Sequence, residues 1–146
     1  MSEPSLSGSL SNMPDSSSMY REQILDLFKN PIHFGKLEPH THSGHKHNPS
    51  CGDEFTVQLF VDARSGKIVD AKFFGSGCAI STASACLFID AIIGKTIDDA
   101  KKMTSDNVIT LLGIPVSASR ITCVTLSMDC LKIATDASAS SSGGAK

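Results

Sequence analysis

The stretch FTVQLFVDARSGKIVDAKFF, residues 55–74, predicts a β-hairpin. From Phe55 to Val61 apolar side chains alternate along the chain, which is the pattern of a strand with one buried face. Ser65-Gly66 supplies the turn, and residues 68–74 return as a second strand. The next segment, 79–93, is rich in alanine and apolar around most of a helical surface, which indicates a buried helix. We therefore expect an antiparallel sheet that packs against this helix.

Helical patterns flank the hairpin on both sides. Residues 20–29 carry an apolar stripe that ends at Asn30-Pro31, because the residue before proline disfavours helix. After Gly94, the patterns predict a short helix capped by Thr96, another over 105–112, and a last one over 117–134. One helix, then strands, then several helices is the order of an α+β fold.

The composition limits the domain count and the classes of partner. A chain of 146 residues is long enough for one domain with its own core, which we place at residues 20–136. The net charge of −2 gives no basic surface for nucleic acid or anionic membranes. Asp90 interrupts the most apolar run, so we expect no membrane span and a cytoplasmic location. The serine-rich ends, 1–19 and 137–146, are predicted to be disordered tails.

The cysteines point to a shared site more than to disulfides. There are five, an odd number, and thiols stay reduced in the cytoplasm. Cys86 lies roughly 12 Å along a helix from Cys78, and Cys130 lies roughly 10 Å from Cys123, at 1.5 Å per residue. Ligands of one zinc ion must lie within about 4 Å of each other, so Cys86 and Cys130 are predicted to be core residues. Cys51, Cys78 and Cys123 remain.

Asp53 adds an oxygen to these three sulfurs. Three thiolates and one carboxylate would make a tetrahedral site in which one ligand is harder than the rest. Cys78 precedes a predicted helix and Cys123 lies early in another, where backbone N–H groups suit an anion such as thiolate or persulfide. No C-x-x-C pair marks the site, however, and Cys51 with Asp53 also fits an ordinary turn. Spacing alone leaves both interpretations open.

Two further features have a functional and a simpler interpretation. A short polar stretch contains four histidines, which can bind metal but more often lie in a solvated loop: His40, His42, His45 and His47. We favour the loop, and His47 is the best candidate ligand because it is closest to Cys51. Arg120 either lies on a solvated helix face or assists Cys123 and anionic sulfur species.

The ordered motifs resemble those of the U-type iron–sulfur cluster assembly scaffolds, the family of the NifU N-terminal domain, IscU and SufU. The similarity runs over residues 20–134. It rests on NPSCGD at 48–53, on GCAIS at 77–81 followed by Ala83-Ser84, on the position of Cys123, and on Asn30-Pro31 followed by Gly35. The resemblance implies a SufE/NifU-like α+β fold with about three antiparallel strands and helices on one face. The third strand would come from residues 35–47 or from the segment near Gly75.

The resemblance also implies a function. Members receive sulfur from a cysteine desulfurase, combine it with iron into a transient [2Fe–2S]-type cluster, and transfer that cluster to apo-proteins. By this resemblance Cys51, Cys78 and Cys123 hold the cluster or metal ion, and Asp53 keeps the site labile. The chain would then be a carrier and not an enzyme.

Departures from the IscU pattern keep alternatives open. Thr122 stands where IscU has a histidine, and LGIPVS at 112–117 retains little of the Leu-Pro-Pro-Val-Lys motif, so docking of an Hsp70-type chaperone is not expected. Arg120 and Thr122 are similar to the residues that SufU has at these positions. The chain lacks, however, the insertion that SufU carries between its second and third cysteines. The first alternative is a SufU-like, zinc-dependent sulfur acceptor that activates a desulfurase, with Cys123 as persulfide acceptor. The second is a structural zinc-binding interaction module.

Overall fold

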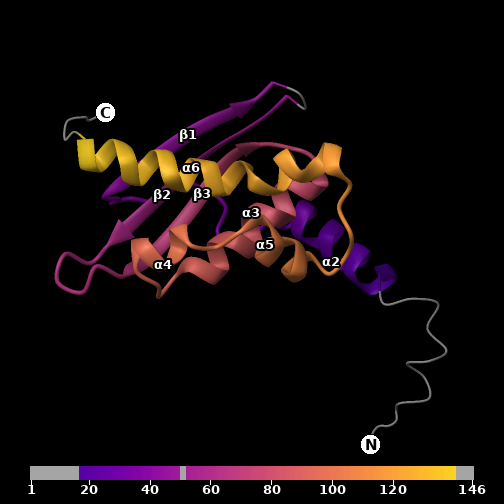
Figure 1. The fold of residues 1–146 in the computed structure, drawn as a ribbon, viewed down its shortest axis with the longest axis horizontal. Helices are drawn as coiled ribbons and strands as arrows, with labels where there is room; N and C mark the ends of the chain where they lie inside the picture. Colours follow the sequence, from indigo (N-terminus) through magenta and orange to yellow (C-terminus); the bar gives the residue numbers. More distant parts are fainter. Residues whose placement is uncertain (1–16, 50–51, 141–146) are drawn as a thin grey trace, which may run out of the picture.

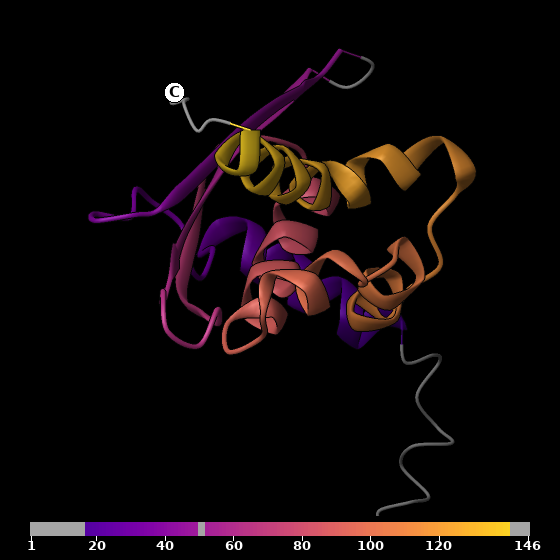
Figure 2. The same ribbon diagram turned by 60° about the vertical axis from the view of Figure 1, so that its left-hand side comes forward.

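The computed structural model describes residues 17–49 and 52–140, and it confirms the α+β class. Its sheet has three antiparallel strands in the order β1-β2-β3: β1 (His42–Asn48), β2 (Asp53–Val61) and β3 (Ile68–Ser76). The helices are α2 (Ser17–Lys29), α3 (Ala79–Ile92), α4 (Ile97–Lys101), α5 (Ser105–Leu112) and α6 (Ile121–Ser140), with a 3-10 turn η1 (Ala118–Arg120) before α6. Figure 1 shows α6 lying along the sheet, and Figure 2 shows the helices gathered on one of its faces.

The core lies between the sheet and helices α3 and α6. The alternating apolar residues of β2 point into it, as predicted, and Phe55, Val57 and Leu59 are at most 1% exposed. The rings of Phe55 and Phe73 meet edge to face with centroids 5.2 Å apart. Each such side chain contributes roughly 1.5–3 kcal/mol when it is fully buried. Helix α3 is buried along most of its length, which confirms the prediction for this segment.

The histidine-rich stretch is an edge strand, so the prediction of a solvated loop is wrong. It forms β1, which pairs with β2 from His42 opposite Leu59 to Asn48 opposite Asp53. This is the third strand of the sheet, and it comes from residues 35–47, the first of the two sources that the resemblance left open, except that it ends at Asn48. Polar composition favoured a loop, but the strand is held by backbone pairing and by Gly44, whose missing side chain lets α6 close against it.

The ends of several elements differ from the sequence prediction. Helix α2 begins at Ser17 and α6 continues to Ser140, so residues 17–19 and 137–140 are helical and not part of disordered tails. The remaining predicted tails, 1–16 and 141–146, lie outside the described residues. None of the helices in the described part is long and apolar enough to span a membrane.

Cys86 and Cys130 are core residues, as predicted. Both side chains are fully buried. Burial raises the pKa of the Cys86 thiol to about 11 and that of Cys130 to about 12. The Cys130 thiol also donates a hydrogen bond of 3.3 Å to the carbonyl oxygen of Phe55. These two cysteines therefore favour the neutral thiol, and neither belongs to the described group of possible metal ligands.

Replacing Gly44 by alanine tests the contact between β1 and α6. A Cβ at this position would collide with the carbonyl oxygen of Cys130 and the amide nitrogen of Ala134, which are both backbone atoms of α6. We expect Gly44→Ala to lower the free energy of unfolding by about 1–3 kcal/mol, as overpacking does, measured by urea denaturation. Ser43→Ala, at the exposed neighbouring position, is the control. Equal stability of the two variants would contradict this packing.

Candidate metal centre

Three of the four predicted ligands meet in the structure. One ligand atom from each of Asp53, Cys78 and Cys123 lies within 4.8 Å of the others. Asp53 is the first residue of β2, Cys78 precedes α3, and Cys123 lies in the first turn of α6. The fourth, Cys51, lies outside the described residues, so its ligand role stays a prediction. The fold thus brings together side chains that the sequence separates widely.

Cys78 is the N-cap residue of α3. Its extended backbone (φ −73°, ψ 176°) turns the chain into the helix, and its sulfur accepts a hydrogen bond of 3.4 Å from the backbone N–H of Ser81. The start of a helix leaves such N–H groups without intrahelical partners, which makes it a binding place for anionic groups. The Cys78 side chain is half-buried, so its sulfur faces the site and remains accessible.

Ser81 connects Cys78 with Asp53, and the sequence analysis did not identify it as functional. The Asp53 side chain is only 4% exposed. Its carboxylate accepts a short hydrogen bond from the Ser81 hydroxyl, whose oxygen also lies 3.3 Å from the Cys78 sulfur. A buried carboxylate needs such a partner. The signal in the sequence was the spacing Cys78-x-x-Ser81, because the third residue after an N-cap commonly reaches back to it.

Gly77 keeps the space beside Asp53 open. A Cβ at Gly77 would lie 2.9 Å from the Phe55 ring and 3.5 Å from the Asp53 carboxyl carbon. A side chain here would therefore crowd the atoms that line the cluster, which agrees with the expectation that glycine allows a close approach. Two thiols and a carboxylate at this separation fit the preferences of zinc or iron.

Cys123 is the most buried of the three clustered ligands. Its side chain is 1% exposed, while Arg120, one turn earlier, is exposed. Arg120 lines a pocket of about 300 Å³ together with Ile80 of α3 and residues 115–117. The pocket lies at the starts of α3 and α6, and a guanidinium group there suits an anionic ligand. The proposed action of Arg120 on sulfur species stays a prediction.

The four histidines lie outside the cluster of thiols and carboxylate. His40 Nδ1 donates a hydrogen bond of 2.9 Å to the carbonyl oxygen of Leu37. His42 is hydrogen-bonded to the Thr41 hydroxyl at 2.7 Å, and partial burial lowers the pKa of His42. His45 and His47 are exposed. The described ligand cluster of Asp53, Cys78 and Cys123 includes no histidine.

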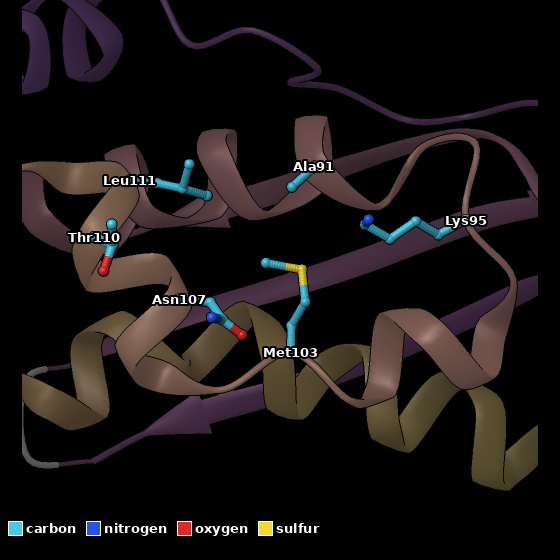
Figure 3. A pocket seen from close by; sticks show the side chains of 6 residues that line it. All are labelled: Ala91, Lys95, Met103, Asn107, Thr110 and Leu111. Atoms are coloured by element: carbon cyan, nitrogen blue, oxygen red, sulfur yellow. The ribbon is translucent and has the colours of Figure 1, made fainter.

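Another pocket, of about 440 Å³, lies between α3 and α5 (Figure 3). Figure 3 shows Lys95 reaching toward it from one end and Leu111 closing the other. Its described lining contains no thiol, carboxylate or imidazole: Ala91, Lys95, Met103, Asn107, Thr110 and Leu111. It therefore offers none of the usual protein ligands for zinc or iron.

Comparison with known proteins identifies the family of the chain. Residues 19–141 match the model of the NifU-like N-terminal domain. The chain is 34% identical over 114 residues to iron-sulfur cluster assembly scaffold protein IscU 1 of Archaeoglobus fulgidus, covering 78% of this chain and 72% of that protein. It is 36% identical over 133 residues to the zinc-dependent sulfurtransferase SufU of Bacillus subtilis, covering 79% and 88%.

A solved structure supports the same relationship. The putative iron-sulfur cluster assembly scaffold protein for the SUF system from Fervidobacterium islandicum superposes with a TM-score of 0.67 and is 33% identical in sequence. The superposition covers 82% of this chain and 98% of that one. The chain therefore belongs to the NifU-like N-terminal domain family, the family of the IscU and SufU iron–sulfur cluster assembly scaffolds.

Proposed function

We propose that this protein is a scaffold for a [2Fe–2S]-type cluster. It would receive sulfur from a cysteine desulfurase, hold the cluster with Cys51, Cys78, Cys123 and Asp53, and transfer it to apo-proteins without catalytic turnover of its own. The observation that carries the proposal is the convergence of Asp53, Cys78 and Cys123 within 4.8 Å from three separate elements. Soft thiolates suit iron and sulfide, so the donor set matches this cargo.

Asp53 gives the site its expected lability. A carboxylate is a harder ligand than a thiolate and is less suited to an iron–sulfur cluster. The Ser81 hydroxyl already donates a hydrogen bond to this carboxylate, which draws electron density away from any bond to a metal ion. Asp53 would therefore complete the site and still release its cargo readily, which is what transfer to an acceptor requires.

A second candidate function is a zinc-dependent sulfur acceptor. It is favoured by the similarity to the protein named zinc-dependent sulfurtransferase SufU, and by Arg120 beside the pocket at the start of α6. In this function the thiolate of Cys123 would attack the outer sulfur of a desulfurase persulfide, and the desulfurase thiolate would leave as the sulfur–sulfur bond breaks. Because Cys123 is 1% exposed, its sulfur would have to become more accessible before a partner persulfide could reach it.

Replacing Asp53 by alanine tests its role in release. We expect a cluster reconstituted on Asp53→Ala to persist longer than on the wild-type chain, by on the order of tenfold, as ligand-shell changes alter metal retention. The decay of the visible absorption under a fixed chelator concentration measures this. Glu54→Ala changes the neighbouring carboxylate, which is exposed, and should leave the lifetime unchanged. Equal or faster loss from Asp53→Ala would contradict the role of Asp53.

Removal of the metal distinguishes the cluster scaffold and the sulfur acceptor from a structural zinc module. The described core is mainly apolar and includes none of the clustered ligands Asp53, Cys78 and Cys123, so we expect the chain to keep its far-UV circular dichroism after chelation. A structural site contributes its binding free energy to folding, and such domains unfold without the ion. Loss of the helical signal on chelation would favour the structural module.

Elemental analysis and mass spectrometry distinguish the two leading functions. Protein purified without oxygen should contain iron and acid-labile sulfide and show charge-transfer bands if it is a scaffold. About one tightly held zinc ion, a colourless spectrum, and added sulfur on Cys123 after incubation with a desulfurase and cysteine would favour the sulfur acceptor instead. Unmodified thiols after that incubation would count against the acceptor.

A further inference from the structure

The histidines of strand β1 lie on opposite faces of the sheet. Gly44 and Asn48 are buried on the side of α6, while the alternate positions 43, 45 and 47 are exposed on the outer face. Successive side chains of a strand point to opposite faces, so His45 and His47 share one face, about 6.6 Å apart along the strand at about 3.3 Å per residue. Two imidazoles at this separation can turn toward one ion.

Glu54 of β2 lies beside both of them. It is the register partner of His47, and the neighbouring pair in the ladder is His45 with Thr56. Side chains directly opposite each other approach to about 5 Å between Cβ atoms, and diagonal neighbours to about 7–8 Å. The carboxylate spans the diagonal, because its Oε1 lies 3.2 Å from His45 Nε2. Glu54 is thus in reach of both imidazoles.

This end of the outer face is open to solvent. The helices cover the other face of the sheet (Figure 2). The segment at residues 33–41 crosses the outer face over its middle, where the Leu37 backbone N–H donates a hydrogen bond of 2.8 Å to Gln58 Oε1. The side chains of His45 and Glu54 remain 54% and 52% exposed. An ion can reach them without any rearrangement of the fold.

We propose that His45, His47 and Glu54 form a second metal site, for a divalent ion of borderline hardness such as Zn²⁺. Two imidazoles and one carboxylate are a ligand set that zinc adopts in open sites, where water completes the tetrahedron. With three exposed protein ligands, the site binds more weakly and exchanges faster than a thiolate site. The three residues are not needed for folding, since an exposed His–Glu pair contributes little to stability.

The pleat of β2 keeps this site apart from the thiol site. Asp53 points to the helix side, where it meets Cys78 and Cys123, and the next residue, Glu54, points to the outer face. The two sites therefore lie back to back at the same end of the sheet and share no ligand. The thiol site offers sulfur and carboxylate donors, whereas the outer site offers imidazole and carboxylate donors. Because the donors differ and no ligand is shared, metal ions bind to the two sites independently.

A zinc titration of the full chain tests the proposal. The chain is first given one equivalent of Zn²⁺, and further Zn²⁺ is then added in a calorimeter. We expect a second, weaker binding event whose affinity falls by roughly tenfold or more in His45→Gln/His47→Gln, since even outer-shell changes at metal sites cost roughly 10–100-fold. The matched control His40→Gln/His42→Gln removes two histidines from the same stretch but none of the three proposed ligands, and should retain the event.

Histidine ring signals in NMR spectra assign the ion to its ligands. The resonances of His45 and His47 should shift with the weaker event while those of His40 and His42 stay in place, and Glu54→Gln should weaken that event. These signals identify the outer site even if the thiols bind no zinc, so its test is separate from that of the cluster scaffold. The proposal is overturned by the absence of a weak event, by equal losses in the two double variants, or by unshifted His45 and His47 signals.

Discussion

The burial of Phe55 fixes the positions of the candidate ligands. Its ring packs edge to face on Phe73 of β3 with centroids 5.2 Å apart, and Gly77 passes close against it on the way to α3. Its carbonyl oxygen accepts a hydrogen bond from Cys130 of α6. One residue thereby ties β2 to the chain segments that carry Cys78 and Cys123. Asp53 lies two positions earlier on the same face of β2, so it is directed at the point where those segments converge.

The two cysteines carried by or preceding each of α3 and α6 differ in their surroundings. Cys86 and Cys130 lie deep in the core, where burial raises each thiol pKa and keeps the sulfur neutral. Cys78 and Cys123 lie at the helix starts, next to a carboxylate and backbone N–H groups. Helix geometry alone separated these classes in the sequence, because seven or eight residues place a second thiol about two turns from the first.

The sequence predicted the parts of the fold whose side chains carry periodic apolar patterns. Strands β2 and β3 and helices α3, α4 and α5 follow from alternation, apolar faces and caps such as Thr96 of α4. Strand β1 was anticipated only through the family resemblance and not from a pattern of its own, because its pairing is a backbone property and its inward contact depends on the absence of a side chain at Gly44. The ligand set was predictable mainly through family resemblance, since spacing left a simple turn open. Ser81 was not identified from the sequence, because its role depends on a contact with Asp53, which is far away in the sequence.

The outer face of β1 is where this chain can vary without loss of fold. The strand is held by its ladder with β2, by the approach of α6 at Gly44, and by an ion pair of 3.0 Å between Lys46 and Asp129 of α6. None of these contacts uses the outward positions of His45 and His47. Polar and charged residues on an edge strand also discourage pairing with another chain. Side chains that the fold does not depend on are free to take on chemistry, and here the pleat places two imidazoles and the Glu54 carboxylate side by side.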